Sequence, residues 1–363
     1  MRKALHFHSL FETTTPWHKP LRKTLHFHSF SSPPSCTFLG PNLPDVWTPK
    51  ENNTSPHTLL PQSFQWTNDG HSATILEGKA IAKQIKLKVA DDIRKMKSEI
   101  GKFPRLAVVL VGDRKDSHTF IHVKMKACDK VGIGTVVSEL PESCTENELL
   151  DVVSEFNDDK DVHGIVVQLP LPQHLDKERI MNVIRPEKDV DGFHPLNIGN
   201  LAIQGRKPFF IPCASKSCIE LLLRHGVEIR GKRVAIIGRS KIAGLPTSLL
   251  LQRHHATVSL LHAYTKNPEL ITSEADIVIA DVGIANIVRG DWIKKGAVVI
   301  DMGTNQVKDS NSRAFRVTGD VCFAEAVKVA SAITPVPGGV GPVTISMLLS
   351  NTLDSAKRAF GMN

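Results

Sequence analysis

The sequence predicts an α/β protein with two domains. Two observations predict this fold class. A chain of 363 residues normally divides into more than one domain. From Ala73 onward, short apolar runs alternate with amphipathic stretches, and the runs end at glycine, proline or polar residues. This alternation is typical of right-handed βαβ units, so we expect parallel sheets covered by helices.

In the first half, three strands are expected, the first of them buried, and a helix is expected before the first strand and after each of the first two. The strands are RLAVVLVG (105–112), GTVVSEL (134–140) and GIVVQLPLP (164–172). The helices lie within ILEGKAIAKQIKLKVADDIRKMKSEI (75–100), which begins with a short extended piece, DSHTFIHVKMKAC (116–128) and TENELLDVVSEFN (145–157). The acids in the first turn of the last helix favour a helix start there.

The second half begins a new series near residue 216. We expect a helix at SCIELLLRHGVEI (217–229), a helix beginning near Leu245, and strands at KRVAIIG (232–238), ATVSLLH (256–262), ADIVIADVG (275–283) and GAVVIDMG (296–303). A final helix, about 342–360, follows ITPVPGGVGP (333–342). A terminal helix after such a loop can cross back to the first half.

Residues 1–70 differ in composition from the rest and are expected to be a leader outside the fold. They are rich in Ser, Thr, Pro and His, and RKALHFHSL (2–10) recurs almost unchanged as RKTLHFHSF (22–30). The two H-x-H pairs leave metal binding open. Few acids with short basic and apolar patches are more typical of an organellar transit peptide, and no apolar region long enough for a secretory signal is present.

Bulk composition excludes several classes of protein. No run of about 18 apolar residues is present, so no membrane span is expected. The six cysteines form no C-x-x-C and no zinc spacing with histidine, so we expect reduced thiols and no metal site. The net charge of +8 suits an anionic ligand, but basic clusters interleaved with aromatic residues are absent, which argues against nucleic acid.

The turn after strand 232–238 is a candidate nucleotide site. VAIIGRSKIAG (234–244) reads G-x-S-x-x-x-G rather than G-x-G-x-x-G. Gly238 allows a tight turn, Ser240 offers a hydroxyl, and Gly244 allows close approach at a helix N-terminus that faces a pyrophosphate. An ordinary α/β turn is the alternative.

The missing acid on the next strand favours NADP over NAD. NAD sites usually end this strand with Asp or Glu, whereas ATVSLLHAYTKN (256–267) has His262 and no acid. Arg239 follows the first glycine, where it can meet a 2′-phosphate. The alternative is that Arg239 is a solvated turn residue.

Polar residues at the expected strand ends of the first half are candidates for ligand contact. Gln168 ends the third strand, and KDVDGFHP (188–195) places Asp189 and Asp191 before a glycine turn. Lys124 lies one helical turn after Phe120. Taken alone, these residues are better explained as loop acids, a strand-end amide and a solvated helix lysine.

Several runs together resemble the bifunctional methylenetetrahydrofolate dehydrogenase/methenyltetrahydrofolate cyclohydrolase family, and its plant organellar members most of all. The resemblance extends from about Ile75 to Phe360 and rests on VGDRKDS (111–117), KMKAC (124–128), HGIVVQLPLP (163–172), EKDVDGFHPLNIGNLA (187–202), IIGRSKIAG (236–244), GDWIKKGAVVID (290–301) and ITPVPGGVGPVT (333–344). It implies a homodimer in which folate binds in a cleft between a catalytic domain and a Rossmann-type NADP domain. The implied reactions are oxidation of 5,10-methylenetetrahydrofolate with NADP and hydrolysis of the methenyl product to 10-formyltetrahydrofolate.

The resemblance also implies domain boundaries and a location. The catalytic domain would comprise residues 71–215 and 334–363, and the NADP domain residues 216–333. The location would be the mitochondrion, with the plastid as alternative. The substrates would be tetrahydrofolate derivatives, polyglutamates among them, whose acidic tail suits a basic chain.

Family roles carry over where the residues match. Lys124 would manage protons in hydrolysis with Gln168 as its hydrogen-bonding partner, and Asp191 would bind the pterin ring. Further folate contacts would come from Ser117, Phe120, Pro337, Gly338, Gly339 and Pro342. The NADP contacts would come from Gly238, Arg239, Ser240, Gly244, His262, Gly283 and Thr304.

The sequence departs from the family pattern around the expected cleft. Phe120 replaces a tyrosine, so a hydroxyl beside Lys124 is lost, and Asp281 stands where a small apolar residue is usual, near the expected nicotinamide position. The remaining departures are Ala214, Ser215, Ser217, Ala243, Ile284 and Ala285. Two alternatives therefore stay open: a dehydrogenase with weakened cyclohydrolase activity, and a catalytically silent paralogue that keeps the fold and the dimer.

Overall fold

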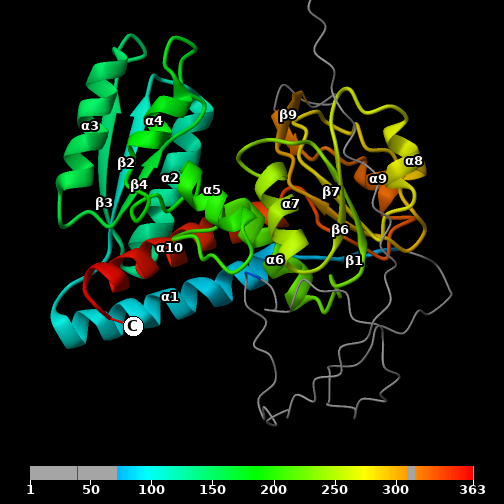
Figure 1. Ribbon diagram of the computed structural model, residues 1–363, viewed down its shortest axis with the longest axis horizontal. Coiled ribbons are helices and arrows are strands. Elements are labelled where there is room, and N and C mark those ends of the chain that lie inside the picture. The colour runs from blue at the N-terminus through cyan, green and yellow to red at the C-terminus, as the bar shows by residue number, and fades with distance from the viewer. Residues whose placement is uncertain (1–38, 40–71, 309–314, 363) are drawn as a thin grey trace, which may run out of the picture. The chain divides into compact units, whose positions relative to one another are not determined.

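The computed structural model describes residue 39, residues 72–308 and residues 315–362. The leader with its repeat therefore lies outside the described residues, apart from residue 39. Within the described residues, two parallel sheets are covered by helices (Figure 1), which confirms the predicted α/β class. None of the described helices combines the length and the apolar character needed to cross a membrane.

The first sheet has three parallel strands in the order β3-β2-β4. They are β2 (Arg105–Val111), β3 (Gly134–Leu140) and β4 (Gly164–Val167), with Val108 of β2 opposite Val137 and Val166. Helices α2 (Lys115–Val131) and α3 (Glu146–Asp158) follow β2 and β3 as expected. Thr145 and Glu148 form a reciprocal capping box, which explains where α3 begins.

The second sheet has six parallel strands in the order β1-β11-β8-β7-β5-β6. The predicted strands are β5 (Arg233–Ile237), β6 (Thr257–Leu261), β7 (Ile277–Ala280) and β8 (Val298–Asp301). The chain passes from β5 to β6 on one side and then returns to β7 on the other. The carboxyl end of β5 is therefore a topological switch point, where open parallel sheets bind ligands.

Two short strands complete this sheet: the first overlaps the short extended piece expected at Ile75, and the second was not predicted. β1 (Thr74–Ile75) pairs with β11 (Ala332–Ile333), although about 260 residues separate them. A separate antiparallel hairpin joins β9 (Asn305–Lys308) to β10 (Phe315–Thr318). Runs of two to four residues carry too little periodicity for prediction from sequence.

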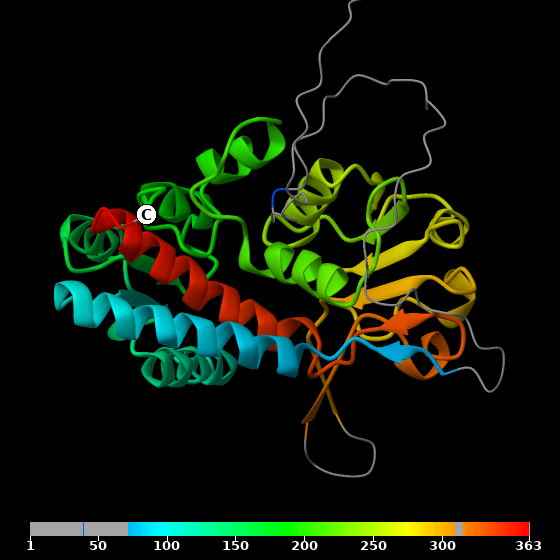
Figure 2. The same cartoon turned by 90° about the horizontal axis from the view of Figure 1, so that it is seen from below.

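Two long helices leave β1 and β11 and lie side by side (Figures 1 and 2). They are α1 (Gly78–Ile100) and α10 (Val340–Ala359). Their starts meet where the Gly78 N–H donates to the Gly338 carbonyl at 2.9 Å, and further along Lys357 pairs with Asp92 at 2.8 Å. The helices therefore run parallel. Their buried apolar faces belong to one hydrophobic core, which includes Ile85.

The remaining helices are shorter. α6 (Cys213–Arg224) and α7 (Gly244–Arg253) were expected from the sequence, and both pack close to the cavity described below. The others were not individually predicted: α4 (Lys177–Val183), α5 (Pro195–Ala202), α8 (Pro268–Thr272), the 3₁₀ turn Gly290–Trp292 and α9 (Phe323–Ala326).

Candidate active site

Lys124 and Gln168 meet beside the carboxyl end of β4. The Lys124 Nζ donates to Gln168 Oε1 at 3.0 Å. Gln168 is the first residue after β4, and its backbone N–H bonds the Val109 carbonyl at 2.9 Å. Its side-chain amide donates to the Leu169 carbonyl at 2.7 Å, which orients Oε1 toward the lysine. The amine of Lys124 is therefore held by a neutral acceptor rather than by a carboxylate.

Two aspartates of the following turn have different partners. Asp189 is buried, and its carboxylate accepts backbone N–H bonds from Gly192, Phe193 and His194 at 2.8–3.1 Å. Burial raises its pKa to about 7, although these bonds oppose the shift. Asp189 therefore holds the turn. Asp191 instead lines a cavity; desolvation raises its pKa, and the charge of Lys124 lowers it.

Polar groups from separate segments of the chain line one cavity. It has a volume of about 200 Å³ and is lined by Lys124, Gln168 and Asp191 from the first half. Ile242 of the nucleotide turn and Thr344 of α10 also line it. Cationic, amide and acidic groups thus share one small, largely apolar space, which suits a planar polar ring.

The other predicted folate contacts are not among the residues that line this cavity. Ser117 is buried in the first turn of α2, and Phe120 lies one turn before Lys124 with 47% of its surface exposed. The loop before α10 contains Pro337, Gly338 and Gly339, and Pro342 lies in the first turn of the helix. Gly338 has a φ of 120°, which favours glycine.

The nucleotide turn joins β5 to α7. Gly238 has a φ of 109°, and a Cβ there would lie 1.9 Å from the Asp281 carbonyl oxygen, so only glycine fits. The Ser240 Oγ accepts the Ala243 N–H at 3.0 Å. Gly244 begins α7 and directs its N–H toward the turn. This turn has the tight geometry and helix N-terminus that a dinucleotide phosphate requires.

The carboxylate of Asp281 is paired with this turn from the end of β7. It immediately follows β7, and its carboxylate accepts the Gly244 N–H at 2.7 Å and the Ser240 hydroxyl. A buried carboxylate without hydrogen-bond partners would lower the stability of the fold, and these two bonds offset that loss.

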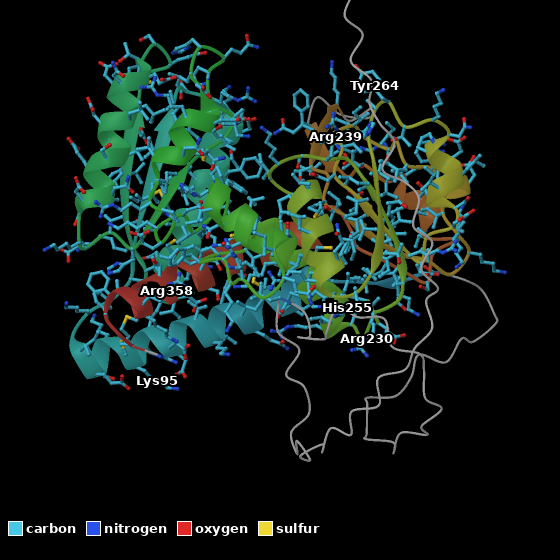
Figure 3. The ribbon with its side chains drawn as sticks, in the orientation of Figure 1. Lys95, Arg230, Arg239, His255, Tyr264 and Arg358 are labelled. Atoms are coloured by element: carbon cyan, nitrogen blue, oxygen red, sulfur yellow. The ribbon has the colours of Figure 1, made fainter. Side chains whose placement is uncertain are left out.

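The remaining predicted cofactor contacts lie around the same end of the sheet. Arg239 and His262 are exposed, and Figure 3 shows Arg239 and Tyr264, two residues beyond His262, at one end of this sheet. Gly283 follows Asp281 by two residues, and its N–H donates to Asp320. Thr304 is exposed at the start of the β9–β10 hairpin.

The departures at residues 214–217 are accommodated by local bonds. Ser215 is buried and accepts the Thr247 hydroxyl at 2.9 Å, while Ser217 donates to the Cys213 carbonyl at 2.7 Å. Ala214 lines the cavity. The bond between Thr247 and Ser215 connects α7 to α6, whereas the bond of Ser217 lies within α6.

The sequence did not indicate several residues that line the cavity or support the turn. Phe193, Cys213, Ile242 and Thr344 line the cavity, and each lies within two residues of a position that the motifs did single out. Asp320 is fully buried and accepts N–H bonds from Val282 at 2.6 Å and from Gly283. Asp320 lies some 40 residues from both donors, so sequence spacing gives no signal for it.

Comparisons with known proteins agree with this arrangement. The family model described as "Tetrahydrofolate dehydrogenase/cyclohydrolase, catalytic domain" matches residues 76–191, and the model of the family's NAD(P)-binding domain matches residues 212–360.

Curated relatives cover most of the chain. The chain is 55% identical over 330 residues to "Bifunctional protein FolD 1, mitochondrial" of Arabidopsis thaliana, which is 91% of each chain. It is 59% identical over 293 residues to "Bifunctional protein FolD 4, chloroplastic" of the same plant, covering 80% of this chain and 81% of the relative.

A solved structure gives the same result. The methylenetetrahydrofolate dehydrogenase-cyclohydrolase of Trypanosoma brucei, complexed with NADP cofactor and inhibitor, is 44% identical with a TM-score of 0.77, covering 80% of this chain and 99% of that one. On these matches, the chain belongs to the tetrahydrofolate dehydrogenase/cyclohydrolase family.

Proposed function

We propose that this protein oxidises 5,10-methylenetetrahydrofolate to the methenyl form with NADP and hydrolyses that product to 10-formyltetrahydrofolate in the same cavity. The observation that carries the proposal is the Lys124–Gln168 bond at a cavity that Asp191 and Ile242 also line. Proton-handling groups and a residue of the nucleotide turn thus border one space. Relatives of 55–59% identity are named as bifunctional proteins.

For the oxidation, the chain supplies position rather than a strong base. NADP, when bound, supplies the hydride acceptor. Gly238, Ser240 and Gly244 would hold its phosphates at the helix N-terminus, where the Asp281 carboxylate bonds Ser240 and the Gly244 N–H in the structure, and the exposed Arg239 would meet a 2′-phosphate. Asp191 would hold the donor edge of the pterin ring, which orients the carbon that loses hydride.

For the hydrolysis, Lys124 would handle protons. Water attack on the methenyl carbon requires removal of a proton, and ring opening requires a proton at nitrogen. The bond to the neutral amide of Gln168 positions the Lys124 amine at the cavity, where it would take and return that proton. The half-buried position of Lys124 at the cavity limits competition from bulk water.

Two assays on the full chain test the proposal. NADPH formation from methylenetetrahydrofolate and NADP follows the first step, and decay of the methenyl absorbance follows the second. We expect both signals. A folded protein that forms no NADPH at any protein concentration would contradict the proposal and favour the silent paralogue.

A second candidate, a dehydrogenase with weakened hydrolysis, rests on Phe120. The side chain has no hydroxyl, and it lies one helical turn before Lys124. NADPH formation accompanied by accumulation of methenyltetrahydrofolate would favour this candidate.

The partner proposals are a homodimer and polyglutamylated folates. Phe315 and Val317 on the β9–β10 hairpin are 68% and 38% exposed, which provides an apolar surface for self-association. The net charge of +8 suits an acidic glutamate tail. Light scattering and a comparison of KM between mono- and pentaglutamate substrates test the two proposals.

We further propose a mitochondrial location and a division into 71–215 with 334–363 and 216–333. The alignment with the mitochondrial relative covers 91% of the chain, and the alignment with the chloroplastic relative covers 80%. The division assigns most of each sheet to its own domain. A fluorescent fusion of residues 1–70 in plant cells, and limited proteolysis, test these assignments.

A further inference from the structure

The chain's own carboxylate occupies the position in the nucleotide turn where a phosphate is expected. Asp281 accepts the Gly244 N–H at 2.7 Å, and this N–H belongs to the first residue of α7. It also accepts the hydroxyl of Ser240, the other phosphate donor of the turn. An anion at this helix N-terminus is favourable, so the carboxylate uses the same stabilisation that a diphosphate would use.

The backbone around Asp281 fixes the carboxylate in that position. The Asp281 N–H donates to the Ile237 carbonyl at 2.7 Å, which ties the residue to the end of β5. Its side-chain oxygen lies 3.0 Å from the position that a Cβ on Gly244 would take. Asp281 therefore lies against both glycines of the turn, with its backbone carbonyl next to Gly238 and its carboxylate next to Gly244.

The charges around Asp281 add to the conflict with a phosphate. Asp320, which follows β10, accepts the N–H groups of Val282 and Gly283, and its charge raises the pKa of Asp281. Asp301, at the end of β8, accepts the Asp320 N–H at 3.0 Å. Arg239 and Lys241 lie in the turn itself; both are exposed, and Lys241 pairs with Glu178 of α4.

We propose that Asp281 sets the affinity for NADP by competing with the cofactor's diphosphate for Ser240 and the Gly244 N–H. NADP binds once the side chain has left these donors, and protonation of the carboxylate weakens its bonds to them. Asp281 thus acts as a residue that determines cofactor affinity, and this inference rests on the proposed function.

The competition predicts a pH dependence of binding. Burial is the main cause that raises the pKa of Asp281, and Asp320 raises it further, while Ser240 and Gly244 lower it. A diphosphate beside the carboxyl group would raise this pKa again, because a second negative charge favours the neutral form. Binding therefore takes up a proton, and affinity rises as the pH falls.

Titration calorimetry of the full chain with NADP at pH 8 tests the inference. We compare the wild type with Asp281→Ala and Asp281→Asn, and use Glu274→Ala as control because it removes an exposed carboxylate just before the same strand. We expect Kd to fall about 10-fold or more in both Asp281 variants, a difference of about 1.4 kcal/mol, and to stay unchanged in the control. Repeating the titration in two buffers of different ionisation enthalpy gives the proton uptake, which we expect in the wild type and not in Asp281→Ala.

The opposite results overturn the inference. If Asp281 serves only to cap α7, Asp281→Ala lowers Tm and leaves Kd unchanged or raised. The Asn variant keeps the side-chain size, so a folding defect confined to the Ala variant still leaves one measurement. If neither the wild type nor the Asp281 variants bind NADP, the proposed function fails together with the inference. If all variants bind with equal Kd, only the inference fails.

Discussion

The charged groups at the cavity and at the nucleotide turn of this protein have different kinds of partner. At the cavity, the cation of Lys124 meets a neutral amide, and the acid Asp191 lines the same space without an ion pair to it in the structure. At the nucleotide turn, the carboxylate of Asp281 already accepts hydrogen bonds from Ser240 and the Gly244 N–H, the donors expected for a phosphate. The first region leaves its reactive group available, whereas the second fills its binding position from within the chain.

The difference teaches that a family motif and its surroundings can carry different information. Gly238, Ser240 and Gly244 keep the pattern of a phosphate turn. The residue that changes the chemistry of the turn is 41 positions after Ser240 and outside the motif. Matching the motif alone would therefore give the right ligand class and miss the competitor.

The largest expected effect comes from removing the amine on the cavity side. Lys124→Met should reduce hydrolysis of methenyltetrahydrofolate by about 10²- to 10⁴-fold, because proton transfer loses its carrier. NADPH formation should fall much less. Decay of the methenyl absorbance gives the rate, and Lys126→Met, an exposed lysine of the same helix, serves as control. Equal rates for wild type and Lys124→Met would remove Lys124 from the reaction.

A smaller effect on hydrolysis is expected when Gln168, the neutral partner of Lys124, is replaced by a charged residue. Gln168→Glu would place a carboxylate at the present 3.0 Å contact and hold the lysine in its protonated form. Hydrolysis should fall roughly 10- to 100-fold near neutral pH, with partial recovery as the pH rises. Gln168→Met, which is neutral, separates the effect of the charge from the loss of the bond. A pH profile of Gln168→Glu that parallels the wild type would contradict this account.

Restoring the missing hydroxyl should have a modest effect. Phe120→Tyr should speed hydrolysis by about 2- to 10-fold, the range of one hydrogen bond. Phe103→Tyr, also a partly exposed ring in the first half, is the matched control. No change in Phe120→Tyr would show that the departure at this position does not limit the rate.

The smallest effect is expected at the ion pair that joins the two regions. Lys241 of the nucleotide turn pairs with Glu178 of α4, and their side chains are 73% and 68% exposed. Lys241→Ala should lower the free energy of unfolding by about 1 kcal/mol or less, because solvent screens such pairs. Urea unfolding of both single variants and of the double variant measures the coupling. A loss above that range would show that this contact holds the regions together.

Local pattern predicted the central strands and the long helices, since these carry continuous apolar runs or helical periodicity. Gln168 was also predicted, because a strand end is visible in the sequence. The pairing of Thr74–Ile75 with Ala332–Ile333 and the bond between Asp281 and Ser240 were not predicted. Both depend on which strands become neighbours in the sheet, and this order is set by tertiary packing rather than by any local run.

Gly78 shows how closely the helix starts depend on each other. A Cβ at this position would lie 1.8 Å from the carbonyl oxygen of Gly339, at the opposite end of the sequence. The first turn of α1 therefore packs directly against the glycine loop before α10, and this contact constrains the start of that helix. Since Thr344 of α10 lines the cavity, the shape of the catalytic space is set in part by one missing methyl group at residue 78.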